Sequence, residues 1–154
     1  MKRYAWMAVA VVMADQLVKA LARRLTGPMT LIPGLIGLRY SENTGMAFSL
    51  LSRHTWLLTA FSALLILVGW RVMRRYRLGR LSRIAAMLML GGAVGNLIDR
   101  LLAGYVVDMF EVLLFRFAIF NVADAALTVG GMLLAVTLLF FPKDWSLKDG
   151  FAKD

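Results

Sequence analysis

Four long runs of apolar residues, separated by polar and basic segments, dominate the hydrophobic pattern of the chain. They extend over about residues 4–21, 55–73, 84–102 and 125–141. Each run is close to the roughly 20 residues that a helix needs to cross the hydrocarbon core of a bilayer. The second run carries no charge before Arg71. The pattern therefore predicts an all-α membrane protein with four transmembrane helices.

A segment of a different kind lies between the first two runs, at about residues 27–52. Prolines and glycines divide it into short apolar pieces, such as Thr30–Ile32 and Leu35–Tyr40. Pieces of this length, bounded by turn residues, are typical of small strands near the surface. In residues 43–48, the turn residue Asn43 and the flexible Gly45 are followed by apolar residues, an order that is typical of a hairpin. We expect a small β-rich segment here, with a hairpin near its end.

The composition supports a membrane protein and restricts its chemistry. The 154 residues are 60% hydrophobic and 18% charged, with a mean hydropathy of +0.72. A soluble domain of this length has too little interior for so much apolar side chain. The length predicts one integral membrane domain, residues 1–154. Because the chain has no cysteine and only one histidine, His54, we expect no disulfide, metal site, cofactor or Ser-His-Asp triad.

The distribution of basic residues predicts the orientation in the membrane. A net charge of +9 would also suit a nucleic-acid partner, but here the basic residues cluster between the apolar runs. Eleven of the eighteen fall on one side, which the positive-inside rule makes cytoplasmic. We therefore expect both termini in the cytoplasm, an extracytoplasmic β-rich segment and no nucleic-acid partner. The eleven are Lys2, Arg3, Arg71, Arg74, Arg75, Arg77, Arg80, Arg83, Lys143, Lys148 and Lys153.

The first apolar run has two further interpretations. A basic start and the sequence Ala20-Leu21-Ala22 would suit a cleaved secretory signal, but Asp15, Gln16 and Lys19 interrupt its apolar core. Asp15 and Lys19 are one helical turn apart, with the acid first. They form either an ion pair within the helix, which makes insertion tolerable, or a polar face turned toward a site.

Four of the nine acidic residues lie between residues 91 and 124, namely Asp99, Asp108, Glu111 and Asp124. Asp108 and Asp124 flank the last two apolar runs, where lipid meets water, and charged groups at such places are usually functional. Asp108 interrupts an apolar, strand-like piece. Asn121, three residues before Asp124, is typical of a helix N-cap with an acid at the third position. A cap alone would explain that pair of residues.

The third apolar run carries small and polar residues on one face. Gly91 and Gly95 form a pair that lets another helix approach closely, and Asp99 continues their face one turn later. Asp99 is therefore either a structural acid, held by Asn96, Arg100 or a neighbouring helix, or part of a site. With the predicted orientation, the costly polar groups of all the spans gather at the extracytoplasmic level, which indicates a surface site.

These residues suggest a reaction. Two adjacent carboxylates cannot both ionise easily, so Asp108 and Asp124 would share a proton. One then activates a water while the other polarises a carbonyl, which is the chemistry of an aspartic protease. Two other interpretations stay open. One is a proton-coupled transporter with Asp15 or Asp99 as carrier, which would need polar groups in both leaflets. The other is an assembly factor whose acids bind a partner.

Five short blocks, in order along the chain, resemble those of bacterial lipoprotein signal peptidase, or signal peptidase II. They are Asp15-x-x-x-Lys19, Asn43-x-Gly45-x-Ala47-Phe48, Gly92-x-x-Gly95-Asn96-x-x-Asp99-Arg100, Val107-Asp108 and Phe120-Asn121-x-Ala123-Asp124. The blocks leave only the tail beyond about Pro142 uncovered. The resemblance implies an aspartic peptidase of the bacterial inner membrane that removes signal peptides from diacylglyceryl-modified prolipoproteins, just before the lipidated Cys.

The resemblance also implies roles for single residues and partners. The catalytic role falls on Asp108 and Asp124. Substrate-binding or supporting roles fall on Asp15, Lys19, Asn43, Gly45, Asn96, Asp99, Arg100 and Asn121. The implied partners are the lipidated substrate, membrane lipid and globomycin-like cyclic peptide inhibitors, and we expect the chain to act as a monomer.

Overall fold

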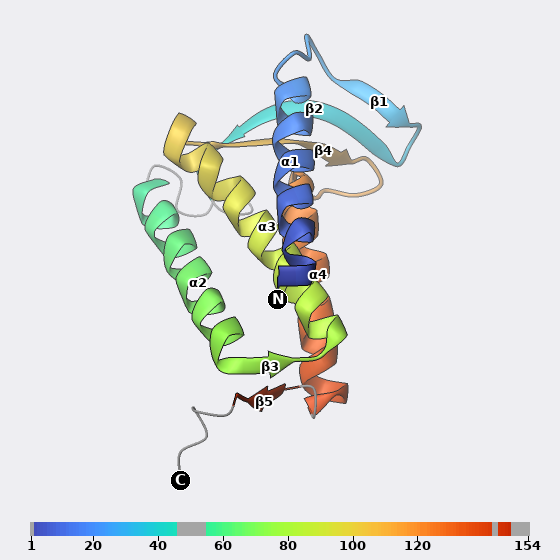
Figure 1. Ribbon diagram of the computed structural model, residues 1–154. Helices are drawn as coiled ribbons and strands as arrows, with labels where there is room; N and C mark the ends of the chain where they lie inside the picture. The colour runs from blue at the N-terminus through green and yellow to red at the C-terminus, as the bar shows by residue number, and fades with distance from the viewer. Residues whose placement is uncertain (1, 46–54, 143–144, 149–154) are drawn as a thin grey trace.

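The computed structural model describes residues 2–45, 55–142 and 145–148 and contains four long helices (Figure 1). All four are long and apolar enough to cross a membrane. The predicted set of four spans is therefore confirmed. The helices are α1 (Ala5–Ala22), which follows a short 3-10 turn (Lys2–Tyr4), α2 (Thr55–Arg75), α3 (Arg80–Ala103) and α4 (Val122–Phe140).

Two helices begin earlier than the hydrophobic pattern predicts. Helix α3 starts at Arg80 instead of residue 84, because its first turn is basic and hydropathy marks only the apolar part of a helix. Helix α4 starts at Val122 instead of residue 125, because Asn121 caps it. Asp124 consequently lies just outside the apolar run but inside the first turn of α4, at the third position after its N-cap. At the other end of α3, Gly104 stops the helix with a φ of 80°, a left-handed conformation that glycine adopts without strain.

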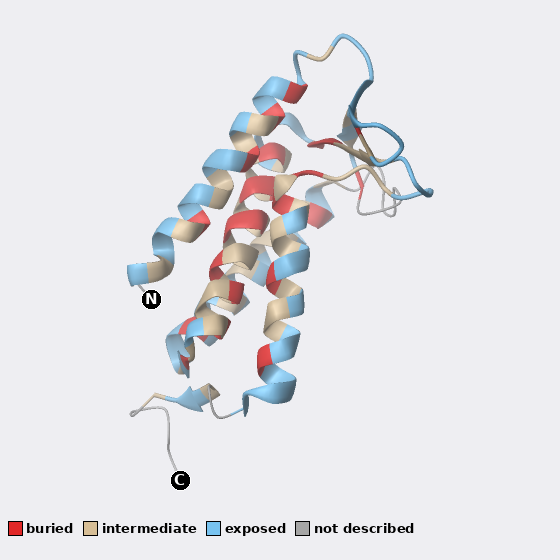
Figure 2. Ribbon diagram, turned by 90° about the vertical axis from the view of Figure 1, so that its right-hand side faces the viewer, coloured by how far each residue is buried: buried red, intermediate tan, exposed pale blue. Residues whose placement is uncertain are grey.

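Helix α3 is the centre of the bundle, and small residues bring its neighbours close. A Cβ added at Gly91 would lie 2.7 Å from Val11 Cβ in α1, and one added at Gly92 would overlap the Ala123 carbonyl of α4. The predicted close approach at Gly91 and Gly95 is confirmed. Buried residues follow α3, whereas the outer faces of α1 and α4 are exposed and available to lipid (Figure 2).

A three-stranded antiparallel sheet lies at one end of the bundle (Figure 1). It consists of β1 (Met29–Ile32), β2 (Ile36–Asn43) and β4 (Val106–Val112), in the spatial order β1-β2-β4. The predicted strands are confirmed, and β2 runs three residues past its predicted end at Tyr40. The hairpin predicted for residues 43–48 lies largely outside the described residues.

A smaller sheet lies at the opposite end and was not predicted. Strand β3 (Tyr76–Leu78) follows α2 directly and pairs antiparallel with β5 (Trp145–Leu147). Both strands have only three residues, too few to show an alternating pattern. Tyr4 and Trp145 pack with Met73, Leu78 and Met87 in one apolar cluster, so both ends of the chain meet the end of α2 here.

Candidate active site

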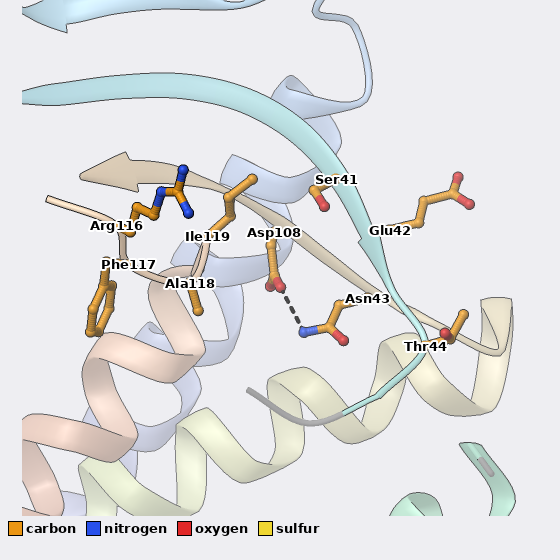
Figure 3. A pocket seen from close by; sticks show the side chains of 9 residues that line it. All are labelled: Ser41, Glu42, Asn43, Thr44, Asp108, Arg116, Phe117, Ala118 and Ile119. Atoms are coloured by element: carbon orange, nitrogen blue, oxygen red, sulfur yellow. Dashed lines mark hydrogen bonds between the residues drawn. The ribbon is translucent and has the colours of Figure 1, made fainter. Parts of the chain in front are cut away.

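The paired strands β2 and β4 place Asp108 beside Asn43. Asp108 lies opposite Ser41 in the register, and Asn43 follows on the same face of β2 two residues later. Asn43 Nδ2 donates to Asp108 Oδ2 at 3.0 Å, as Figure 3 shows. Asn121 Nδ2 donates to the other oxygen, Oδ1, at 2.7 Å. Asp108 is only 2% exposed, so these two amides fix the carboxyl group in a buried place.

The start of α4 places Asp124. Asn121 Oδ1 accepts the Asp124 backbone N–H at 2.8 Å, and Asp124 Oδ2 accepts the Asn121 backbone N–H at 3.2 Å. This reciprocal pair is the predicted capping box, which is therefore confirmed. Asn96 Nδ2, from α3, donates to Asp124 Oδ1 at 2.7 Å. The carboxylate of Asp124 thus stands at a helix N-terminus, where negative charge is favoured.

Asn121 joins the two acids. Its side chain donates to Asp108 while its backbone donates to Asp124, so a single fully buried residue contacts both carboxyl groups. Asn121 Nδ2 also lies 3.1 Å from Asn96 Oδ1 and 3.3 Å from the Val107 carbonyl. From the described residues, each of the four carboxyl oxygens of Asp108 and Asp124 accepts one hydrogen bond, and each bond comes from an uncharged amide or peptide group.

A second group of polar residues surrounds Lys19. It adjoins the group around Asp108 and Asp124 through Asn96, which contacts both Lys19 and Asp124. Lys19 Nζ lies 2.8 Å from Asp15 Oδ2, 2.9 Å from Asp99 Oδ2 and 2.9 Å from Asn96 Oδ1. A lysine ammonium has three protons to donate, and here all three have an acceptor. Lys19 and Asp15 are both inaccessible to solvent, and Asp99 is 2% exposed. The ammonium therefore neutralises charge that burial would otherwise make costly.

The group around Lys19 also holds neighbouring elements in place. Asp15 Oδ1 accepts the Ala123 backbone N–H at 2.9 Å, which ties α1 to the start of α4. Asp99 Oδ2 accepts the Val107 backbone N–H at 3.0 Å, which ties α3 to β4. Both interpretations of Asp15 and Lys19 therefore hold, since they form an ion pair and also face the site. Asp99 is held by a neighbouring helix, one of the predicted alternatives.

Asp108 and Asp124 both line a cavity of about 520 Å³ between β4 and α4. Apolar side chains of α4 and of the β4–α4 connection, among them Phe117 and Leu127, form much of its wall. Arg100 reaches the same cavity, and its Nη2 donates to the Gly45 carbonyl at 3.3 Å. Within the described part of the chain, the buried Nε of Arg100 has no hydrogen-bond partner. A second cavity of about 330 Å³ adjoins the first over Asp108, on the side of β2 shown in Figure 3.

Burial changes the acidity of Asp108. Burial, and in smaller part the nearby charge of Asp124, raise the pKa of this carboxyl from 3.8 to about 6. The hydrogen bonds from Asn43 and Asn121 act in the opposite sense, because they stabilise the ionised form. The pKa of Asp108 therefore lies closer to neutral pH than that of an ordinary aspartate.

All ten residues singled out from the sequence lie at this end of the bundle. Sequence reasoning missed Gln16, whose Nε2 donates to Asp99 Oδ1 at 3.1 Å and to the Gly95 carbonyl at 3.2 Å. The signal was a polar residue inside the first apolar run. It also missed Arg116 and Phe117, which line the cavities from the β4–α4 connection and had no distinguishing sequence pattern. Among the described residues, no group of His, Cys, Asp and Glu could hold a metal ion.

The fold matches those of solved bacterial membrane enzymes. One, solved in meso at 2.3 Å resolution, gives a TM-score of 0.83 at 27% identity and covers 90% of this chain and 88% of its own. A second, solved at 1.9 Å, gives 0.79 at 27% identity, with 92% and 95% covered. The four spans and the small sheet at one end therefore define a multi-pass membrane enzyme of bacterial type.

The sequence identifies the family. The model of "Signal peptidase (SPase) II" matches residues 7–140. The lipoprotein signal peptidase of Latilactobacillus sakei is 38% identical over 91% of this chain and 95% of its own length. That of Lactiplantibacillus plantarum is 37% identical over 88% and 93%. The chain belongs to the signal peptidase II family, a family of proteases, as the resemblance implied. Nothing in these comparisons supports the transporter alternative.

Proposed function

We propose that this chain is an aspartic endopeptidase that cleaves signal peptides from diacylglyceryl-modified prolipoproteins, just before the lipidated Cys. Asp108 and Asp124 are its catalytic residues. The observation that carries the proposal is the pair of carboxyl groups joined through Asn121 at the wall of one cavity. Among the described residues, the hydrogen bonds to these carboxyl groups come from uncharged amide and peptide groups, which leaves both acids free to change protonation state. Membership of the signal peptidase II family supports the reaction.

The proposed reaction uses Asp108 as the acid and Asp124 as the base. Asp108, with its pKa near 6, starts protonated and donates its proton toward the scissile carbonyl oxygen. Asp124 starts ionised at the N-terminus of α4 and takes a proton from a water, whose oxygen attacks the carbonyl carbon. When the C–N bond breaks, Asp124 gives that proton to the leaving nitrogen. Asp108 recovers its own as the new carboxyl forms, so the dyad returns to its first state.

The cavity suits a substrate that is itself a membrane helix. Its apolar wall continues along α4 through Leu127 and Val129, toward the interior of the membrane. The signal peptide would lie along this wall, with the lipid on the Cys holding the scissile bond at the interface. Arg100, whose buried Nε lacks a partner among the described residues, is placed to bind a carbonyl of the substrate. Globomycin-like cyclic peptides would occupy the same cavity.

The remaining residues are proposed to support the dyad. Asn43, Asn96 and Asn121 orient its carboxyl groups. Lys19, with Asp15 and Asp99, holds α1, α3, β4 and α4 in register. The single membrane domain would act as a monomer, without metal or cofactor.

The proposal fixes the orientation, with both termini in the cytoplasm of a bacterial inner membrane and the site outside. The basic residues near β3 support it. A reporter fused after Tyr76 should score cytoplasmic, and one inserted near Gly104 should score extracytoplasmic. The reverse result would put the acids on the wrong face for lipoprotein processing.

Cleavage of a lipidated prolipoprotein by purified protein in detergent tests the mechanism. Asp108→Asn and Asp124→Asn should each lower the rate by about 10²-fold or more while substrate binding persists. A metal chelator should have no effect. Glu111→Gln is the matched control, since Glu111 lies on the same strand as Asp108 but pairs with Arg39 at 3.1 Å on the surface. Activity of either dyad variant within about tenfold of the parent would reject the mechanism.

A further inference from the structure

A basic groove lies at the end of α2 farthest from the active site. It encloses about 780 Å³ and is lined by three arginines together with apolar residues of the same helix. Arg71, Arg74 and Arg75 are spaced three and four residues apart, so they share one face of α2. Leu67 continues that face one turn deeper, and Trp70 lies beside it, half exposed. The groove therefore combines positive charge at its mouth with apolar surface toward the membrane interior.

No acidic side chain in the described part of the chain pairs with Arg71, Arg74 or Arg75, the arginines of this groove. The sequence has no Asp or Glu between Glu42 and Asp99, whereas it has seven arginines there. The three arginines of the groove are not needed to cap the helix either. Lys148 Nζ does this from beside β5, by donating to the Met73 and Arg74 carbonyls at 3.3 and 2.6 Å.

An apolar crevice continues from the groove into the bundle. It encloses about 330 Å³ between α2, α3 and α4, and it shares Val68, Trp70 and Val72 with the groove. Both volumes are within the usual range of ligand pockets. Trp145 closes the crevice from β5, and its buried indole Nε1 has no acceptor among the described residues. An occupant that brings a carbonyl oxygen would satisfy that N–H.

We propose that the groove and the crevice together bind one anionic phospholipid. The phosphate lies among Arg71, Arg74 and Arg75, because arginine is well suited to phosphate oxygens and acts more strongly near a low-dielectric surface. One acyl chain enters the crevice between α2 and α3, and the glycerol ester lies near Trp70, a residue type enriched at membrane interfaces. The lipid then fills the space between α2 and the rest of the bundle. The inference is independent of the catalytic proposal.

Two pairs of substitutions test the head group. The protein, in neutral detergent, is incubated with equal amounts of dioleoyl phosphatidylglycerol and dioleoyl phosphatidylcholine, and retained lipid is measured by native mass spectrometry. The parent should retain the anionic lipid in excess. Arg71→Gln/Arg75→Gln should lower that preference on the order of 30-fold. The control Arg3→Gln/Arg80→Gln removes the same charge from exposed residues outside the groove and should retain it.

A glycine substitution tests the acyl chain. Gly69 lines the crevice, and a Cβ added there would meet nothing within 4 Å, so Gly69→Leu fills the space without displacing the backbone. Gly69→Leu should weaken retention of the dioleoyl lipid about tenfold or more, because the acyl chain can then bury fewer of its methylene groups in the crevice. Gly131→Leu, also in open space but outside the crevice, should not.

Several results would overturn the proposal. They are equal retention of the two lipids by the parent, equal loss in both double-arginine variants, and unchanged retention in Gly69→Leu. Displacement of the lipid by millimolar inorganic phosphate as readily as by phosphatidylglycerol would also overturn it, because the site would then recognise only an anion.

Discussion

Four carboxylates, three of them buried and Asp124 partly buried, meet at one end of this bundle in two pairs with different partners. Asp15 and Asp99 lie against the ammonium of Lys19, at 2.8 and 2.9 Å. Asp108 and Asp124 lie against amide and peptide N–H groups. The first pair is sealed from solvent, whereas the second lines an open cavity.

The difference separates two ways of holding an acid in this protein, one with a cation and one with uncharged amides. The acids around Lys19 each contact its ammonium and also accept a backbone N–H, so they are held by a full charge and by the main chain of a neighbouring element. Amide groups orient a carboxyl without supplying a full charge. Asp108 is thus held in position while burial still raises its pKa to about 6. The position of the Asp108 carboxyl is set by the amides of Asn43 and Asn121, whereas its pKa is raised mainly by burial.

Removing the cation should have the largest effect on stability. Lys19→Met leaves the charges of Asp15 and Asp99 buried without a partner, which should lower the free energy of unfolding by about 3–5 kcal/mol. Arg23→Met is the control, since Arg23 is partly exposed and lies 3.9 Å from the same Asp99; it should cost about 1 kcal/mol or less. Unfolding in detergent measures both. If the two variants melt alike, Lys19 does not hold the site together.

Substituting one acid of each pair should separate their roles. Asp99→Ala leaves the Val107 N–H without an acceptor and removes one of the three acceptors of Lys19, so it should cost about 1–3 kcal/mol of stability as well as activity. Asp108→Asn removes repulsion with Asp124, and its amide oxygen can still accept the hydrogen bond from Asn121. Its melting temperature should hold or rise slightly while activity is lost. If instead Asp108→Asn collapses and Asp99→Ala melts normally, the structural and catalytic acids are reversed.

A methyl group can disturb the fixed pair without changing any charge. A Cβ at Gly95 would lie 2.7 Å from Asp15 Oδ2, so Gly95→Ala should displace that carboxylate from Lys19 and cost about 1–3 kcal/mol. Gly131→Ala is the matched control in α4, where a Cβ meets nothing within 4 Å. It should be neutral or slightly stabilising, since alanine favours helix. Equal melting temperatures for the two variants would show that Asp15 has room to move.

The reactive pair should respond to pH. Because the pKa of Asp108 is raised from 3.8 to about 6, this group adds stability below about pH 4 and loses it as pH rises through about 6. Cleavage should decline over the same upper range as the acid is lost. Asn43→Ala removes a hydrogen bond that lowers the pKa, so the decline should move to higher pH.

Ser41→Ala is the control for a small substitution in β2. Ser41 lies opposite Asp108 in the register, but the hydrogen bond to Asp108 comes from Asn43, two residues further along the strand. The rate profile of Ser41→Ala should match that of the parent. A profile in Asn43→Ala that stays in place, or moves to lower pH, would contradict the assignment of the proton to Asp108.

Local contacts of the site were predictable, and distant ones were not. The Asn121–Asp124 capping box and the Asp15–Lys19 pair each depend on residues three or four apart on a helix, a spacing visible in the sequence. The bond from Asn43 to Asp108 spans 65 positions and depends on the register of β2 against β4.

Features of the fold that were not predicted include the β3–β5 sheet and the start of α3. The pairing of β3 with β5 brings Tyr76 against Leu147, and neither three-residue strand has a pattern of its own. Hydropathy located the centres of all four spans. It did not locate the start of α3 at Arg80, because a helix continues into polar residues that hydropathy excludes.

The hydrogen bond from the Ala123 N–H to Asp15 has a consequence for synthesis in the cell. It joins the first span to the last, across 108 positions. Because the chain is made from its N-terminus, α1 enters the membrane long before α4 exists. Until then Asp15 lacks its backbone partner, and Asp108 lacks both Asn121 and Asp124. The proposed site of a nascent chain is therefore incomplete while its own spans are being inserted, and it is assembled only when α4 has been made.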